Sequence, residues 1–179
     1  MPIWRIGTVT RYRGLGYLHA TDSRKAPRFV GKSVASIWVP YEVVLDEDEG
    51  LDSGADFLRF SSGGVIACNQ RSKDAIYPLV NDDVEFLPLT HSLEPYYVVN
   101  VVKTYPCFDY ERSKVTYFPS GNVKGVGRIA LKPDCNDKSP IFKIEEFLLS
   151  MIFVTDVVKQ TVEDYELQGL TFEQVVQRI

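Results

Sequence analysis

Residues 140–175 constrain the fold more than any other part of the chain, because they predict four elements in a fixed order. Residues 141–144 and 151–154 are short apolar runs rich in β-forming residues, which is typical of strands. A helical pattern follows at 155–166, and an alternating pattern begins again at 170–172. The predicted order is therefore strand, strand, helix, strand.

The predicted helix has a start, one apolar face and an end. Thr155 or Asp156 can supply the N-cap oxygen that accepts from the first backbone N–H groups. Gly169 follows the helix as a stop signal. The apolar face is formed by the residues that recur at helical spacing, Val158, Val162 and Tyr165. We expect the core to be most sensitive where the pattern is most regular, at Phe142, Ile152, Val162 and Phe172.

The same order of elements recurs 86 positions earlier. Residues 66–69 correspond to 152–155 in this alignment, and residues 57–60 correspond to 141–144 with two fewer residues in the loop that follows. The later positions that correspond are Lys73 to Lys159, Ile76 to Val162, Val84 to Leu170 and Phe86 to Phe172. The pattern predicts a duplicated module, residues 57–86 and 141–172, related by approximate internal symmetry. Chance similarity is the alternative, because few of the matched residues are identical.

The remaining apolar runs indicate the fold class. Strands are predicted at 3–9, 34–41 and 96–102, and the last alternates poorly, which indicates a strand buried on both faces in the middle of a sheet. Residues 115–118 and 128–131 predict a pair of strands joined by a turn-rich connection. We therefore expect an α+β fold with a mostly antiparallel or mixed sheet.

Two principal helices are expected in this fold, near Asn69–Leu79 and Thr155–Glu166. Asn69 is the predicted cap of the first helix, and Pro78 is predicted to end it early. The chain of 179 residues is long enough for one domain with a substantial core, and its hydrophobic content of 45% is typical of globular proteins.

The three cysteines and the apolar segments bear on the cellular compartment. Cys68, Cys107 and Cys135 are odd in number and widely spaced, so we expect neither a disulfide framework nor a zinc site. The N-terminal residues lack the apolar core of a signal peptide, and no apolar stretch approaches the ~20 residues of a membrane helix. A reducing cytoplasm fits these features best.

Charge is distributed unevenly, although the net charge is only −4. Residues 1–41 contain one acid and seven cations, Arg5, Arg11, Arg13, Arg24, Lys25, Arg28 and Lys32. Residues 42–56 contain seven acids and no base. The basic segment could bind the phosphates of a nucleic acid. The acidic segment is either a solvated loop or a surface that meets a basic partner.

No catalytic motif fits the spacing of the reactive residues. His19 and His91 are far apart, and neither has a Cys, His or carboxylate at metal-ligand spacing. Cys107 has no basic neighbour that would activate a thiol. We therefore expect a binding protein with no cofactor and no metal, rather than an enzyme. An enzyme whose site is assembled from distant residues stays an alternative.

Several of these stretches resemble the signature of one family. They are the strand 141–144, the helix from Thr155 to Glu166, the strand 169–172, and the run 96–102 with its continuation at 109–115. On these residues the chain resembles the immunity proteins of bacterial polymorphic toxin systems, in particular their family eleven. Thr155 stands where the family has a serine cap, and Glu145-Glu146 stand where a glycine follows the basic residue of the strand.

The resemblance covers residues 56–175, so we expect one immunity-protein-like domain over 1–179 with a variable N-terminal part, 1–55. It implies a protein that binds a cognate toxin or secreted effector domain and blocks its active site or the path of its substrate. We expect no membrane partner, and nucleic acid is the less favoured partner because the chain is acidic as a whole. The predicted toxin-binding residues are Trp38, Tyr41, Glu42, Asp46, Glu47, Asp48, Glu49 and Asp52.

Overall fold

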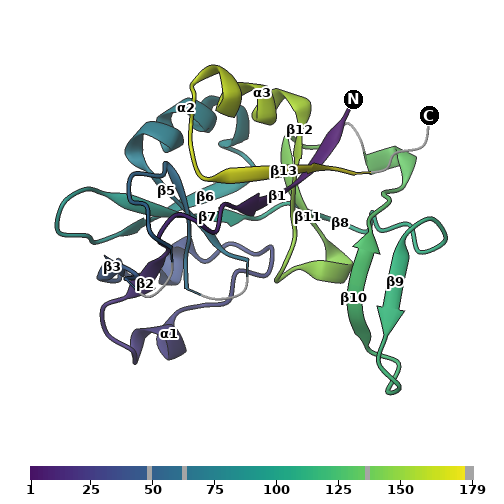
Figure 1. The fold of residues 1–179 in the computed structure, drawn as a ribbon, viewed down its shortest axis with the longest axis horizontal. Coiled ribbons are helices and arrows are strands. Elements are labelled where there is room, and N and C mark those ends of the chain that lie inside the picture. The colour runs from purple at the N-terminus through teal and green to yellow at the C-terminus, as the bar shows by residue number, and fades with distance from the viewer. Residues whose placement is uncertain (48–49, 62–63, 136–137, 176–179) are drawn as a thin grey trace.

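The structure is a computed structural model that describes residues 1–47, 50–61, 64–135 and 138–175 (Figure 1). Its helices are α1 (Asp22–Lys25), α2 (Gln70–Val80) and α3 (Asp156–Asp164), with short 3-10 helices at Ala35–Ile37, Pro133–Cys135 and Glu145–Phe147. Its strands are β1 (Ile3–Thr8), β2 (Leu15–Tyr17), β3 (Val43–Leu45), β4 (Phe57–Arg59), β5 (Ile66–Asn69), β6 (Val84–Leu89), β7 (Tyr96–Val101), β8 (Thr104–Tyr105), β9 (Lys114–Tyr117), β10 (Val123–Arg128), β11 (Ile141–Ile144), β12 (Ile152–Thr155) and β13 (Leu170–Gln174).

The strands form two larger sheets and two ribbons. One sheet has the order β13-β1-β12-β11-β8 and the other has the order β4-β5-β7-β6, while β2–β3 and β9–β10 pair as separate ribbons. The strands pair antiparallel apart from β8, which runs parallel to β11. Helices α2 and α3 lie side by side above the two sheets (Figure 1). The expected α+β class with mixed sheets and two principal helices is confirmed.

The two predicted modules have the same order of elements. The first runs β4, β5, α2, β6, and the second runs β11, β12, α3, β13 with a 3-10 turn added after β11. Their strand registers also correspond, since Phe57 lies opposite Cys68 and Ile141 opposite Val154. Each sheet is completed by a strand from outside the module, β7 between β5 and β6, and β1 between β12 and β13. The repeated pattern therefore corresponds to a repeated topology.

Side-chain contacts in the two modules repeat as well. Lys73 Nζ lies 3.9 Å from the centre of the Tyr97 ring, and the Tyr97 hydroxyl donates to Gln70 Oε1 at 2.7 Å. The second module repeats both contacts, with an ammonium 4.9 Å from a ring centre and an indole N–H 3.0 Å from a carboxylate oxygen, through Lys159, Trp4 and Asp156. These two sets occupy corresponding positions on the helix and on the inserted strand. A shared contact pattern of this kind supports duplication over chance similarity.

The start of each helix shows how the sequence positions it. Asn69 caps α2, and its side chain accepts from Ser72 N at 3.0 Å, as predicted. Thr155 holds the N-cap position of α3 without a side-chain cap bond, and its hydroxyl instead donates to Pro140 O at 3.4 Å. The prediction that Pro78 ends α2 early is wrong, because the helix continues through Pro78 to Val80.

The end of α3 differs from the prediction that Gly169 is its stop signal. The helix ends at Asp164, and Glu166 takes the left-handed conformation with φ 51°. Leu167 N then donates to Val162 O at 2.9 Å, which is the bond of a Schellman cap. Gly169 lies further along, and a Cβ there would be 2.0 Å from the carbonyl oxygen of Phe57. Glycine at this position permits the close approach of the second module to β4.

Three expectations about strands outside the modules are corrected. Residues 34–41 were expected as a strand, but Ala35–Ile37 form a 3-10 helix. The paired strands β2 and β3 lie in segments that the apolar pattern did not mark as strands. The second strand of the predicted hairpin begins earlier than 128–131, since β10 spans Val123–Arg128. These strands are short and partly exposed, so hydrophobic periodicity marks them weakly.

The core contains most of the positions that the pattern marked. Phe142, Ile152 and Val162 are each at most 3% exposed. Phe172 is only partly buried, which corrects the expectation that it is a full core residue. Its edge strand β13 has β1 on one side, so its side chain reaches the core without being enclosed. Within the described ranges, no helix is both long and apolar enough to cross a membrane.

Candidate functional site

The predicted acidic surface lies on and beside the β2–β3 ribbon, at the opposite end of the molecule from the β9–β10 ribbon (Figure 1). Glu42 and Glu47 are exposed, whereas Asp46 is partly buried. Glu42 contacts His19 Nε2 at 3.1 Å, and the exposed Asp52 contacts Arg11 Nε at 3.5 Å. The structure thus brings part of the acidic segment together with the basic segment that precedes it. The predicted residues Asp48 and Glu49 lie outside the described residues.

The two predicted aromatic anchors pack within the protein itself. The Trp38 indole N–H donates to Pro88 O at 2.8 Å, and its ring centre lies 5.1 Å from that of Tyr41 and 5.9 Å from that of Phe29. Tyr41 also contacts Tyr17 edge to face, with the ring centres 5.5 Å apart. Both residues are half-buried. They attach the N-terminal segment to the edge of the β4–β6 sheet, which leaves only part of each ring for a partner.

Asp56, the last acid of the segment, is a buried structural residue. Its side chain is 6% exposed, and it accepts from Gln168 N at 2.8 Å, from Asn69 Nδ2 at 3.1 Å and from Arg71 Nη1 at 3.1 Å. These bonds join the cap of α2 to the turn before β13. The acidic surface therefore ends before Asp56. Sequence reasoning missed this role because a buried and an exposed aspartate look alike in a charge count.

Some of the basic N-terminal residues are paired with acids of the same protein. Arg5 forms an ion pair with Glu173, and Lys25 Nζ lies 3.6 Å from Asp22. Together with the contact between Arg11 and Asp52, these pairs neutralise three of the seven cations. A binding surface for nucleic acid needs clustered cations that face the phosphates. The geometry is therefore less suited to nucleic acid than the sequence indicated.

Cys68 and His19 carry reactive groups, and the structure shows the surroundings of both. Cys68 is fully buried, and burial raises the pKa of its thiol to about 12, which disfavours the reactive thiolate. His19 contacts Glu42 on an exposed surface, a pairing that the sequence separation hid. Among the described residues, no three His, Cys, Asp or Glu side chains are grouped to hold a metal ion.

Lys143 is a buried cation in the family-like strand β11. Its Nζ donates to the backbone oxygens of Phe29 at 2.6 Å and Leu148 at 2.8 Å. Burial lowers the pKa of this amine to about 8. A neutral amine keeps two N–H donors, which is enough for both carbonyl groups. Lys143 thus ties β11 to the N-terminal segment at Phe29 and to the residues at Leu148 that follow the strand.

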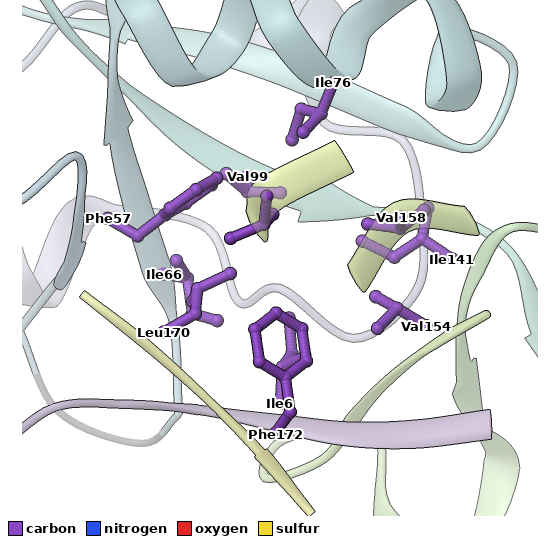
Figure 2. Close-up of a pocket in the computed structure, with 11 residues that line it drawn as sticks. Ile6, Phe57, Ile66, Ile76, Val99, Ile141, Val154, Val158, Leu170 and Phe172 are labelled. Carbon is purple, nitrogen blue, oxygen red and sulfur yellow. The ribbon is translucent and has the colours of Figure 1, made fainter. Parts of the chain in front are cut away.

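A small cavity lies where the two modules meet. Its volume is about 20 Å³, and Figure 2 shows that its lining comes from both modules and from the inserted strands. The lining is entirely apolar and includes Phe57, Ile66, Val99, Ile141 and Phe172. A cavity of this size without polar groups offers a water molecule no hydrogen-bond partner. We interpret it as a packing defect between two similar faces rather than as a binding site.

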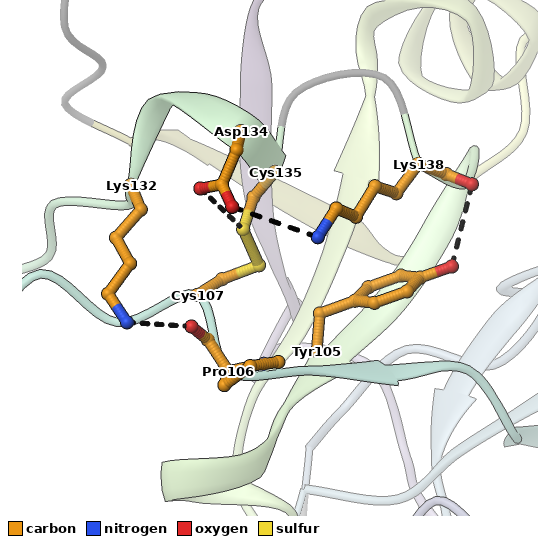
Figure 3. Close-up of a disulfide and its surroundings, with 7 residues drawn as sticks. All are labelled: Tyr105, Pro106, Cys107, Lys132, Asp134, Cys135 and Lys138. Carbon is orange, nitrogen blue, oxygen red and sulfur yellow. Dashed lines mark hydrogen bonds and ion pairs between the residues drawn. A yellow bond between two sulfur atoms is a disulfide. The ribbon is translucent and has the colours of Figure 1, made fainter.

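The expectation that the cysteines are unpaired is wrong for Cys107 and Cys135, which form a disulfide across a separation of 28 residues (Figure 3). Both sulfur atoms are buried in a cluster that includes Phe108 and Leu131, and these two residues form an antiparallel bridge. The wide spacing concealed the pair, because the backbone pairing of Phe108 with Leu131, rather than the local sequence, brings the two cysteines together.

The described residues thus form an α+β scaffold in which two segments share one order of elements. Sequence comparison places this scaffold among known proteins. The profile described as Immunity protein family (Imm11) matches residues 40–177, and the chain belongs to this family. Comparison with curated proteins gave no match.

The family match extends further toward the N-terminus than the resemblance in the sequence. That resemblance placed residues 1–55 in a variable part outside the family-like region. The match begins at residue 40 and includes the whole acidic segment. That segment is therefore part of the region that the family describes.

Proposed function

We propose that this protein binds a cognate bacterial toxin and neutralises it by covering the active site or the path of the substrate. Membership in the immunity protein family carries the proposal. Inhibition of this kind needs complementary surfaces rather than chemistry. A standard interface buries about 800 Å² of each partner, which is under a tenth of the 9770 Å² surface of this protein.

The test uses the toxin domain encoded beside the gene for this chain. Purified protein is expected to bind that domain with a Kd of about 1 µM or tighter and to abolish its activity in a stoichiometric titration. Expression of this chain is expected to restore growth to cells that produce the toxin. A chain that neither binds the toxin domain nor protects the cells would refute the proposal.

The acidic segment is proposed to steer the encounter with the toxin. Glu42 and Glu47 are exposed, which supports this role, whereas the ion pair of Asp52 with Arg11 weakens the local field. Changing residues 46–49 together to serine is expected to slow association, more at low salt than at high salt. Equal association rates of the wild-type protein and the serine variant at low salt would show that the segment is only solvated.

The cellular compartment is decided by a separate measurement. The expectation of a cytoplasmic location rested partly on unpaired cysteines, and the Cys107–Cys135 disulfide removes that support. Disulfides persist mainly in oxidising compartments. Trapping free thiols in intact cells with an alkylating reagent reports the state of this pair. Alkylation of Cys107 and Cys135 in native cells would support the cytoplasmic assignment, and protection of both would contradict it.

A further inference from the structure

The β9–β10 ribbon is built as an arm that extends from the protein. Its strands pair only as a separate two-stranded sheet, with Val126 opposite Val115, and it extends away from the two larger sheets (Figure 1). Two-stranded hairpins are marginally stable in water by themselves. An arm of this kind needs an anchor at its base.

A disulfide, hydrogen bonds and apolar contacts anchor the base of the ribbon. The Cys107–Cys135 disulfide closes the loop that contains the whole ribbon. Asp109 N donates to Ala130 O at 3.0 Å, and Arg128 Nη2 donates to Arg112 O at 3.0 Å. The inner residues of the ribbon, Val115 and Val126, pack against the cluster around the disulfide. The base is thus fixed, and the tip is held out into solvent.

The segment that contains the arm, residues 112–133, has the opposite charge to the rest of the protein. Residues 112–133 contain no acid and five cations, Arg112, Lys114, Lys124, Arg128 and Lys132. Because the whole chain has a net charge of −4, these five cations leave −9 on the remaining residues. A basic arm attracts an acidic surface of a partner, whereas the acidic segment at the opposite end of the molecule attracts a basic one.

The tip of the arm exposes large apolar side chains. Tyr117 is 53% exposed and Phe118 is 48% exposed, and Val123 on the facing strand is 39% exposed. Lys124 Nζ lies 5.9 Å from the centre of the Phe118 ring. Aromatic residues are enriched in protein interfaces, and tyrosine is among the side chains that most often dominate their binding energy. Such a group at the end of a fixed arm is placed to enter a concave site.

The arm is less suited to extending a sheet of a partner. Its register shifts between Val123 and Gly125 and again between Val126 and Arg128. Such irregularities twist a ribbon and interrupt its row of free backbone groups, and lysines along its edges hinder a further strand. A partner therefore meets the side chains of the tip rather than the backbone.

From these observations we infer that the β9–β10 arm is the toxin-contacting element, and that Tyr117 and Phe118 enter a cleft lined by carboxylates on the toxin domain. This inference rests on the proposed function and specifies the surface that performs it. Two antiparallel strands are about 5 Å apart, so the arm is narrow enough to enter a cleft that the broader body cannot. Carboxylates in that cleft would pair with Lys114 and Lys124.

The same chemistry could in principle serve a nucleic acid, since cations and aromatic rings also bind phosphates and bases. The acidic body opposes that partner, because the remaining residues carry a net charge of −9 and repel a polyanion longer than the arm itself. A toxin protein whose carboxylates are confined to one cleft avoids this repulsion. The charge distribution therefore favours a protein partner.

The test compares variants of the arm with matched variants elsewhere, using the toxin domain encoded beside the gene. Tyr117→Ser with Phe118→Ser is expected to weaken binding by about 30-fold or more. The control is Tyr165→Ser, which removes an aromatic residue 57% exposed on the helical side and is expected to change the Kd by less than about 3-fold. Thermal unfolding of each variant confirms that the fold is retained.

A second pair of variants tests the charges and keeps the aromatic tip. Lys114→Gln with Lys124→Gln is expected to slow association about 10-fold at low salt, with a smaller effect at high salt. Arg24→Gln with Lys25→Gln removes the same charge from the exposed end of α1 and is expected to leave the rate within about 2-fold. These charge variants stay informative if the serine variants disturb the ribbon.

The outcomes separate the two proposals. If wild-type protein binds the toxin domain and the arm variants bind equally well, the inference about the arm is wrong and the proposed function stands. If wild-type protein does not bind, the proposed function fails and the inference fails with it. Arm-dependent binding of a single-stranded oligonucleotide, or arm-dependent dimerisation of this chain without loss of toxin binding, would also overturn the inference.

Discussion

Replacing Asp56 by alanine removes an acceptor at the junction of the two modules and is expected to lower the free energy of unfolding by about 3–4 kcal/mol. The carboxylate accepts from Gln168 N, from the amide of the α2 cap Asn69 and from Arg71. Loss of the bond to the Gln168 N–H contributes about 1–3 kcal/mol. The weakened helix cap adds about 1 kcal/mol, and the ion pair with the half-exposed Arg71 adds at most about 1 kcal/mol.

Two further variants make this prediction specific. Asp56→Asn keeps one oxygen acceptor and removes the charge, so we expect a smaller loss of about 1–2 kcal/mol. Asp52→Ala removes an exposed acid of the same segment, whose contact with Arg11 contributes about 0–1 kcal/mol. The loss in the free energy of unfolding is therefore expected to be largest for Asp56→Ala, smaller for Asp56→Asn and smallest for Asp52→Ala.

Urea denaturation followed by circular dichroism measures these differences, and binding of the folded variants to the toxin domain measures their affinity. If Asp56 is structural, its variants lose stability while the folded fraction keeps wild-type affinity. A loss below about 1 kcal/mol for Asp56→Ala would show that the carboxylate does not hold the junction. Wild-type stability with reduced affinity would show that Asp56 faces the toxin, and the assignment from burial would be refuted.

Three further predictions follow from buried contacts. Gly169→Ala places a Cβ 2.0 Å from Phe57 O at a backbone φ of 109°, so we expect a loss of at least about 3 kcal/mol in urea denaturation, and a loss under about 1 kcal/mol would contradict the close approach. Burial lowers the pKa of Lys143 to about 8 from its ordinary value of 10.5, so the unfolded chain holds more protons between these pH values and the free energy of unfolding rises with pH there. Relative to Lys143→Met, this gain is expected to approach ~1.4 kcal/mol per pH unit, and a difference that stays constant from pH 7 to pH 10 would contradict it. Reducing the Cys107–Cys135 disulfide opens a loop of 28 residues and is expected to lower the free energy of unfolding by about 3–4 kcal/mol, with Cys68→Ser under the same reductant as the control for thiol effects, and unchanged unfolding after reduction would contradict the role of the pair.

The sequence by itself determined the two modules and their helices. Apolar periodicity marked the strands and helices of both because their buried faces repeat at the spacing of each element. The cap at Asn69 and the buried run of β7 were read correctly for the same local reason. Family membership was also recognisable from short stretches of the second module and from residues 96–102 and 109–115, and the family match confirms it.

The tertiary structure alone decided how these parts meet. Strands β1 and β7 are each inserted into a sheet beside strands that are distant in sequence. The Cys107–Cys135 pair and the contacts of the buried Asp56 likewise join residues that are distant in sequence. Local patterns report which face of an element is buried, but they do not report its neighbours. The partial burial of Phe172 has the same origin, because it depends on the edge position of β13.

The candidate binding surfaces show this division clearly. Composition marked the acidic segment, but only the fold revealed that Glu42 contacts His19 and that Asp52 contacts Arg11. It also revealed that Trp38 is half-buried and that its indole N–H donates to Pro88 O. The basic residues of the β9–β10 arm were dispersed in the sequence, and pairing of the two strands gathers them on one projecting ribbon. A charge count sums over the chain, whereas a partner meets only the charges that folding places together on one surface.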